Sequence, residues 1–264
     1  MNSIAEDNAT IEPTSLDEWA ELFWKLYGPE EKKLHPTEVF MRLSEAGGKI
    51  AEDVRRDRYY NALESLVECL CAALNMYNRI TKDDKFKNYF SEKNYIGFNK
   101  FVFDKFPYHC PHCGGKHCIC FIKFNDSENR TEEEKIKIRN KIDLALSKAR
   151  ANRIPPTRID DFGTLFKGIY GQGHQYMTID VICFHLLEEI GEVAEALRKL
   201  LNGNENKSSK EFRDAFLSEL ADVVSWTFAL LKKIEYHIRN ASPNPKNKDT
   251  IPSLSALLKS KYLK

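Results

Sequence analysis

Three carboxylates stand in or beside the apolar row of one helical segment, residues 184–200, "FHLLEEIGEVAEALRKL". Glu189 occupies a position in the row itself, where steps of three and four residues bring apolar side chains onto one face. Glu192 lies almost one turn further along, and Glu188, four residues before Glu192, can reach the same patch. The helix therefore places acids where it would otherwise bury aliphatic side chains.

A second helical segment, residues 212–230, repeats the arrangement. Glu219 interrupts its apolar row, and Asp222 follows three residues later. Because a short polar loop, "NGNENKSS", joins the two segments, we expect them to pack antiparallel with their apolar rows facing each other. Four or five carboxylates would then meet in an apolar setting, which costs several kcal/mol for each uncompensated ion.

A divalent cation is the simplest compensation for such a cluster. Oxygen ligands favour hard ions, Mg²⁺ before Ca²⁺, with Mn²⁺ as a substitute. Mg²⁺ readily shares its coordination with phosphate oxygens, so the pattern predicts a phosphorylated substrate. The alternative is a pair of solvated acidic faces, which is the usual meaning of a single Glu-x-x-Glu. Two such pairs, both interrupting apolar rows, favour the metal site.

Both segments resemble the MazG-like members of the all-α NTP pyrophosphohydrolase superfamily, through "HLLEEIGEVAEALRKL" and "SELADVVSWTFALL". The resemblance covers about residues 160–240. It implies hydrolysis of an NTP or dNTP between the α and β phosphates, giving the monophosphate and pyrophosphate. By that analogy the Mg²⁺ ligands are Glu189, Glu192, Glu219 and Asp222. Glu188 would be a further ligand or the base that orients water, which makes Glu188 and Glu189 the catalytic candidates.

Four further residues are candidates for substrate binding. Trp226 lies one turn beyond the second acidic pair and could stack on a nucleobase, although a core tryptophan would have the same spacing. Tyr170 and His174, in "YGQGHQY", are expected in a glycine-containing loop, where they could line a base pocket. Lys199 could meet phosphates, although a cation near a helix C-terminus is more often explained by the helix dipole.

A cysteine cluster lies in "YHCPHCGGKHCICF", with Cys110, Cys113, Cys118 and Cys120. Cys-x-x-Cys followed by Gly-Gly is typical of a zinc knuckle, so we predict one tetrahedral structural Zn²⁺ with Zn–S bonds near ~2.3 Å. Alternative ligands are His109, His112 and His117, and the alternative interpretation is a set of reactive thiols. The other three cysteines, in helical patterns, are expected to pack in the core. They are Cys69, Cys71 and Cys183.

Helical patterns dominate the whole chain, and we predict an all-α antiparallel bundle of the MazG-like type with a small zinc-binding insertion. The first helix should stop at Gly28-Pro29, and the second should be weakened at Gly47-Gly48. Residues 151–163 read as a proline-containing linker. The expected regions are an N-terminal helical region (1–105), the zinc knuckle (106–125), a connecting helix and linker (126–156), the catalytic domain (157–240), and a flexible segment with a C-terminal helix (241–264).

The first half also contains a candidate repeat of the two acidic helices. "GGKIAEDVRR" aligns with "IGEVAEALRK" at an offset of 143 residues, and "LESLVECLCAAL" aligns with "LSELADVVSWTF" at an offset of 154. Ala46, Lys49 and Ser65 then face Glu189, Glu192 and Glu219, while Glu68 faces Asp222. If the repeat is real, the first half has lost its metal site and kept its helices. Two helical hairpins can also align by chance.

Composition limits the classes of partner. The 264 residues carry 40 Lys and Arg against 39 Asp and Glu, so no global field favours nucleic acid or an anionic membrane. The N-terminus lacks the apolar core of a signal peptide, and no apolar run approaches the roughly 20 residues of a bilayer span. We expect a cytoplasmic enzyme whose partner is its nucleotide substrate, with homodimerisation left open.

Two other functions remain compatible with the same residues. One is hydrolysis of another pyrophosphate-linked substrate, such as a nucleotide sugar or a dinucleotide. The other is a non-catalytic, zinc-containing helical interaction module, in which the carboxylates bind metal for structure alone.

Overall fold

The computed structural model describes residues 12–86, 90, 97–120, 130–202, 209–241 and 251–263. Every regular element in these residues is a helix, which confirms the predicted all-α class. The helices are α1 (Leu16–Glu31), α2 (Pro36–Arg55), α3 (Tyr59–Thr81), α5 (Gly97–Lys105), α7 (Glu132–Asn152), α8 (Ile159–His174), α9 (Ile179–Leu201), α10 (Ser209–Ala241) and α11 (Leu254–Tyr262). None of these helices is both long and apolar enough to cross a membrane.

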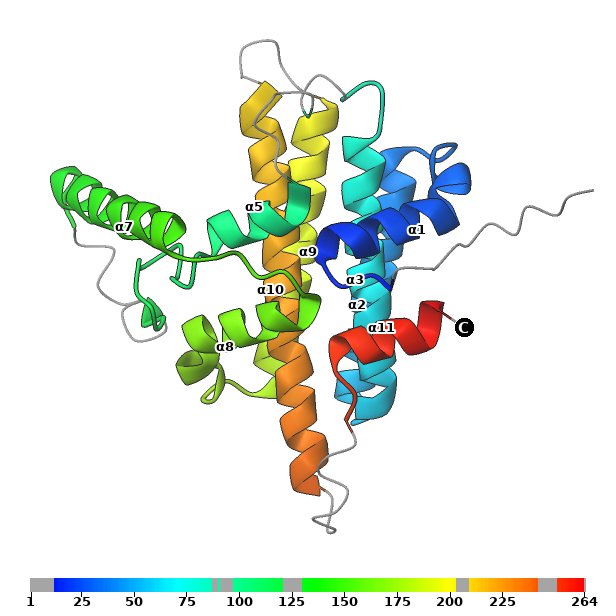
Figure 1. Cartoon of the computed structure of the whole chain (residues 1–264). Helices are drawn as coiled ribbons and strands as arrows, with labels where there is room; N and C mark the ends of the chain where they lie inside the picture. The colour runs from blue at the N-terminus through cyan, green and yellow to red at the C-terminus, as the bar shows by residue number, and fades with distance from the viewer. Residues whose placement is uncertain are drawn as a thin grey trace, which may run out of the picture.

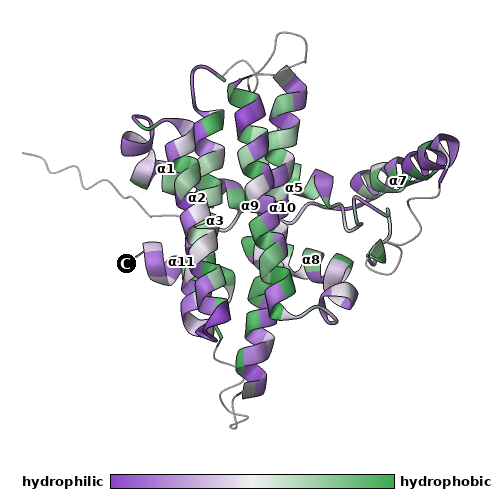
Figure 2. Ribbon diagram, turned by 180° about the vertical axis from the view of Figure 1, so that it is seen from behind, coloured by the Kyte–Doolittle hydropathy of each residue, from purple (hydrophilic) through white to green (hydrophobic). Residues whose placement is uncertain are grey.

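Four long helices, α2, α3, α9 and α10, lie side by side and form the centre of the molecule (Figures 1 and 2). The shorter helices α1, α5, α8 and α11 cross them on one side, and α7 extends away from the bundle (Figure 1). Apolar side chains from all four long helices meet in one continuous core. Its fully buried members include Leu43, Ile50, Leu66, Leu74, Leu186, Val193, Val223 and Leu230.

The predicted end of the first helix at Gly28-Pro29 is wrong, and the predicted weak point of the second at Gly47-Gly48 does not interrupt it. α1 continues past Gly28-Pro29 to Glu31, whose buried carboxylate is held by Arg42 at 3.0 Å. α2 runs without a break through Gly47. A Cβ added at Gly47 would lie 2.7 Å from a methyl carbon of Ile190 on α9. The glycine therefore permits a close approach of two helices and does not end one.

The predicted linker and loop before α9 are largely a helix. α8 begins at Ile159, just after the two prolines at 155 and 156, and it includes both Tyr170 and His174. Phe162, Phe166 and Ile169 on its inner face are buried, and Phe166 packs against Phe228 of α10. The glycines of "GIYGQGH" lower its helix propensity, and burial of these apolar side chains outweighs that cost.

The helix bounds of the two halves correspond. α8 begins 143 residues after α1, and α9 begins 143 residues after α2, which is the offset of the first aligned segment pair. The second aligned pair has an offset of 154 residues. Adding 154 to the bounds of α3 gives a range that lies within α10. The candidate repeat, which stays a prediction, thus extends to three helices on each side, α1–α2–α3 and α8–α9–α10.

Candidate functional site

Three of the four predicted Mg²⁺ ligands converge between α9 and α10. Glu189, Glu192 and Glu219 each offer a carboxylate oxygen that lies within 4.8 Å of the other two. The two helices pack through their buried apolar rows, and this packing fixes the acids opposite one another. Glu189 and Glu219 are half-buried, whereas Glu192 is exposed, so the cluster opens to solvent on one side.

Burial and mutual repulsion weaken the acidity of these groups. Burial, with the neighbouring Asp222 and Glu192, raises the pKa of Glu189 to about 8. Burial also raises the pKa of Glu219 to about 7, against the opposing effect of Lys105. Without a cation the cluster therefore retains protons at neutral pH. A divalent ion would remove that penalty and ionise all three groups.

The fourth predicted ligand, Asp222, already has a cationic partner that the sequence pattern did not identify. The ammonium group of Lys105, at the end of α5, forms an ion pair with the Asp222 carboxylate. It also donates to the backbone oxygen of Ser218 at 2.9 Å and to the Ser218 hydroxyl at 2.7 Å. Burial raises the pKa of Asp222, and the Lys105 contact opposes that rise. Lys105 is thus an internal counterion at the edge of the cluster.

The predicted substrate-binding aromatics form a connected row beside the cluster. Trp226 donates its indole N–H to the Glu189 carboxylate at 3.0 Å. His185 stacks on the Trp226 ring at a centroid distance of 4.5 Å, and His174 lies 5.2 Å from it. Tyr170 stacks on His174 at 5.5 Å. The indole orients a carboxylate of the cluster, and His185 already covers one of its faces.

His174 is held as a neutral imidazole within this row. Burial, followed by repulsion from His185 and Lys233, lowers the pKa of His174 to about 4. His174, which α8 contributes to the row, is therefore uncharged at neutral pH. The row provides flat, hydrogen-bonding walls, and the charge of the site comes from the carboxylates.

Glu188 and Lys199 have other partners. The exposed Glu188 carboxylate lies 3.1 Å from Nδ1 of His185. Lys199 pairs with Glu195, one turn earlier in the same helix. Glu188 therefore borders the aromatic row through His185, whereas the observed partner of Lys199 is a solvent-exposed acid of α9.

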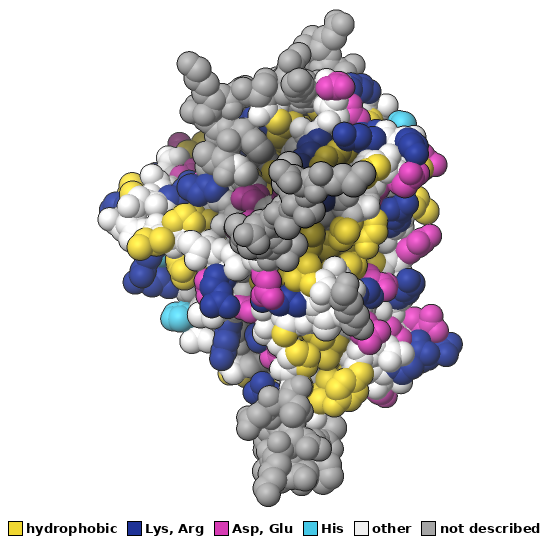
Figure 3. Space-filling model, turned by 45° about the vertical axis from the view of Figure 1, so that its right-hand side comes forward, with side chains coloured by type: hydrophobic (Ala, Val, Ile, Leu, Met, Phe, Trp, Pro, Cys, Tyr) yellow, Lys and Arg dark blue, Asp and Glu magenta, His cyan; other side chains and the backbone are white. Residues whose placement is uncertain are grey.

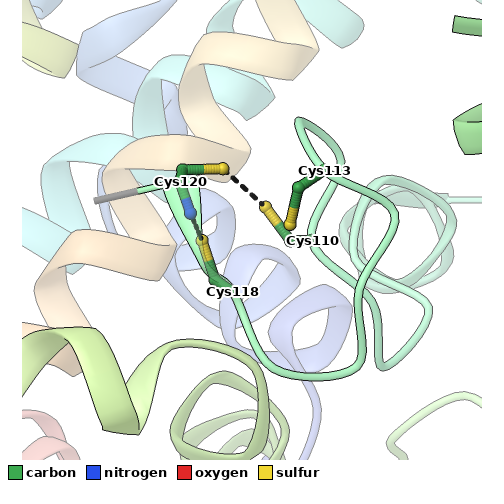
Figure 4. Close-up of side chains that lie close together, drawn as sticks. All are labelled: Cys110, Cys113, Cys118 and Cys120. Atoms are coloured by element: carbon green, nitrogen blue, oxygen red, sulfur yellow. Dashed lines mark hydrogen bonds between the residues drawn. The ribbon is translucent and has the colours of Figure 1, made fainter. Parts of the chain in front are cut away.

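The four clustered cysteines converge on one point, as Figure 4 shows. Their sulfur atoms lie within 4.8 Å of one another, and Cys110 Sγ is 3.8 Å from Cys120 Sγ. A tetrahedron with metal–sulfur bonds of ~2.3 Å has edges of about 3.8 Å, so the sulfurs fit a four-thiolate metal site. Hydrogen bonds from Cys110 and Cys120 lower the pKa of Cys118 to about 4. These contacts favour the thiolate form of Cys118, which is the form that binds a metal.

A tight turn builds this cysteine cluster and docks it on α8. Gly114 adopts a positive φ of 67° and donates to the Cys110 carbonyl at 2.8 Å. Cys118 donates its backbone N–H to the Ile169 carbonyl at 2.7 Å. The turn follows α5, which ends at Lys105, and its Cys118 contact ties it to the helix that carries Tyr170.

The predicted alternative ligands and core cysteines can also be placed. Nδ1 of His109 lies 3.0 Å from the backbone carbonyl oxygen of Pro107. Nδ1 of His117 lies 3.0 Å from the backbone carbonyl oxygen of Gly168. Exposed His112 is close enough to Asp222 to lower the pKa of that carboxyl. The three remaining cysteines are buried, as predicted, and burial raises their pKa values. They are Cys69, Cys71 and Cys183.

The convergence of acids, the internal lysine and the cysteine cluster thus define the candidate site by geometry alone. Comparison of the chain with known protein families, with curated proteins and with solved structures finds no significant match.

Proposed function

We propose that the protein is a Mg²⁺-dependent nucleoside triphosphate pyrophosphohydrolase of the MazG-like type, which releases pyrophosphate from an NTP or dNTP. The observation that carries the proposal is the meeting of Glu189, Glu192 and Glu219 within 4.8 Å across two helices. An all-oxygen donor set of this kind suits Mg²⁺, or Mn²⁺ in its place. Substrate phosphates would complete its coordination.

The chain's own residues would divide the work of the reaction. Glu189, Glu192 and Glu219 would hold the ion, which when bound neutralises phosphate charge and polarises the α-phosphate. Glu189 is fixed by the Trp226 N–H, and Glu188 is the proposed base for water because it borders the same row. Lys105 would leave Asp222 free to join the ligands and would itself reach the incoming phosphates.

A large cavity of ≈ 930 Å³ adjoins the aromatic row and supports a nucleotide substrate. It lies between α8 and α10, where His174, Phe166 and Phe228 contribute aromatic walls. Lys167 and Lys233 add positive charge to the same cavity. Aromatic walls with nearby cations suit the base and sugar of a nucleotide whose phosphates reach toward the carboxylates.

The cysteine cluster would hold a structural Zn²⁺. Four sulfur ligands fill a tetrahedral site and leave no position for substrate, so its role would be to position neighbours. Those neighbours are Lys105 before the cluster and α8 beneath it. All seven cysteines are free thiols, in keeping with a reducing compartment, and we propose a cytoplasmic location on that basis.

Pyrophosphate release is the direct test. The purified full-length chain would be assayed with the common NTPs and dNTPs, a nucleotide sugar and a dinucleoside polyphosphate, each with and without Mg²⁺. We expect Mg²⁺-dependent formation of a nucleoside monophosphate and pyrophosphate from at least one triphosphate. Products from the other substrates alone would favour the second pyrophosphate-linked class.

Matched variants in one helix connect the activity to the cluster. Glu189→Gln should abolish pyrophosphate release, whereas Glu195→Gln, on the exposed side of α9, should retain it. Absence of any Mg²⁺-dependent product across the panel would refute the enzymatic proposal. It would favour the interaction module, provided that Mg²⁺ still raises the melting temperature.

A further inference from the structure

A second pocket lies in the first half, at the place that corresponds to the carboxylate cluster. It has a volume of ≈ 200 Å³, and its lining includes Ala46, Lys49 and Glu68. Under the offsets of 143 and 154 residues, these three positions correspond to the cluster positions Glu189, Glu192 and Asp222. The two halves therefore place a cavity and an acidic cluster at equivalent points of their helix pairs.

In this pocket, the ammonium groups of two lysines neutralise the acidic side chain. Lys49 Nζ lies 3.2 Å from one carboxylate oxygen of Glu68, and Lys261 Nζ of α11 lies 2.7 Å from the other. Ala46 contributes no ligand. Because Glu68 is already neutralised by two ammonium groups, a divalent cation would gain little here. Any ligand of this pocket is expected to bind without a metal.

The floor of the pocket carries an unpaired hydrogen-bonding group. The Asn75 side chain is 5% exposed and lines the cavity, yet its Oδ1 has no hydrogen-bond partner within the described part of the chain. Its Nδ2 has only a long contact of 3.7 Å to Cys71 Sγ. A buried carbonyl oxygen without a partner costs about 1 to 3 kcal/mol, so Asn75 is suited to a ligand that donates to it.

The walls and the mouth of the pocket differ in character. Tyr27 and Tyr262 flank the interior with aromatic rings and hydroxyl groups. At the mouth, the side chains of Lys49 and Arg42 are 61% and 48% exposed, and each also pairs with an acid, Glu68 and Glu31 respectively. The exposed Glu45 belongs to the same lining, so a bound anion would exchange with these acids for the two cations. Figure 3 shows basic and acidic side chains interspersed on the side of the molecule that carries α1 and α11. A polar aromatic interior with cations at its mouth suits a planar polar group that carries an anion.

We propose that this pocket binds a nucleoside phosphate without a metal, with the base edge on Asn75 and the phosphate on Lys49 and Arg42. An amide side chain presents a donor and an acceptor side by side, which matches the paired acceptor and donor edge of a nucleobase. The interior is large enough for a base, and the phosphate remains in the open mouth. The site is separate from the carboxylate cluster and does not depend on hydrolysis there.

Calorimetric titration of the full-length, zinc-loaded chain in buffer without added divalent cation tests the proposal. The probes are AMP, GMP, CMP and UMP, with the parent nucleosides and inorganic phosphate as controls. We expect one site per chain for at least one nucleotide, at least tenfold tighter than its nucleoside or phosphate alone. No binding, or phosphate binding as tightly as the nucleotide, would overturn the proposal.

Variants assign the binding to the first half. Lys49→Met and Asn75→Leu should each weaken nucleotide binding at least tenfold, whereas Lys167→Met, at an exposed lysine of the cavity between α8 and α10, should leave it unchanged. Lys49 is exposed and Glu68 retains Lys261, so Lys49→Met decides the matter if the buried Asn75→Leu variant fails to fold. Loss of binding in Lys167→Met but not in Lys49→Met would place the nucleotide in the second half and refute this site.

Discussion

The two halves of the molecule share a helix arrangement but compensate buried acids in different ways. In the second half three carboxylates meet, and the nearby lysine, Lys105, comes from α5 and neutralises Asp222. In the first half the acid that corresponds to Asp222, Glu68, is held by Lys49 and Lys261. An ammonium group of the chain itself neutralises an acid at all times, whereas an acidic cluster without one must keep protons or take up a cation.

The side chains around the two sites also differ in size and in hydrogen-bonding capacity. Trp226 donates to Glu189 in the second half, and the aligned position in the first half is Ala72. A large donor therefore orients a carboxylate in one half, while a small residue helps to leave a cavity in the other. The two aligned helix pairs thus carry a carboxylate cluster in one half and a cavity in the other.

Transplanting the first half's lysine gives the largest expected effect. Glu192→Lys would place an ammonium group among Glu189 and Glu219, as Lys49 lies against Glu68. We expect pyrophosphate release to fall at least about a thousandfold, roughly 4 kcal/mol of transition-state stabilisation, because the ion can no longer bind. Initial rates at saturating Mg²⁺ provide the measurement.

Glu195→Lys is the matched control for that charge reversal. Glu195 lies on the same helix but pairs with Lys199 in solvent, so its change should reduce the rate by less than threefold. Equal losses in the two variants would mean that overall charge, and not the ion site, sets the rate. The contrast between the halves would then carry no functional meaning.

Loss of the cysteine cluster should have the next largest effect. Cys110→Ser removes a buried sulfur from the cluster, and we expect zinc content to fall from one per chain to none. The free energy of unfolding should drop by roughly 3 kcal/mol, because the turn that docks on α8 loses its crosslink. Metal analysis and urea denaturation measure both.

Cys183→Ser is the control for the cysteine cluster, since Cys183 is a buried thiol of α9 outside it. It should retain full zinc content even if it loses some stability. Full zinc content in Cys110→Ser would contradict a four-sulfur site.

Removing Lys105 should show that it competes with the metal ion for Asp222. Lys105→Met leaves Asp222 buried without its partner, so stability without Mg²⁺ should fall by about 2 kcal/mol. Added Mg²⁺ should restore most of that loss and bind more tightly than in the unaltered chain. Thermal denaturation over a Mg²⁺ series measures this, with Lys100→Met of the same helix as control.

A pH dependence gives the smallest expected effect. The folded pKa of Glu189, about 8, lies above the ordinary carboxyl value of 4.5, so the folded state keeps a proton that the unfolded state has lost. Stability without Mg²⁺ should therefore decline as pH rises from about 4.5 to 8, by roughly 1 to 2 kcal/mol after solvent screening.

Millimolar Mg²⁺ should remove most of this decline, and Glu189→Gln should flatten it. Urea denaturation at pH 5 and pH 8 provides the measurement. An equal Mg²⁺ effect at both pH values would argue against binding at the ionised cluster.

Local sequence signals predicted much of the helical structure. The capping boxes of Ser15 with Glu18 and of Thr131 with Glu134 are both present. The convergence of Glu189, Glu192 and Glu219 also followed from the sequence, because periodic apolar rows fix the faces of two adjacent helices. These features depend on residues a few positions apart or on one short connection.

Long-range packing decided what the sequence could not. Lys105 reaches Asp222 across 117 positions, and Lys261 reaches Glu68 across 193. Helix α8 was missed because its glycines and preceding prolines outweigh, locally, an apolar face whose burial depends on α10. The sequence by itself thus determined most of the helices, α8 excepted, and the acids on the faces of α9 and α10. The tertiary structure alone decided which cation meets each acid, because ion pairing depends on distance in space and not along the chain.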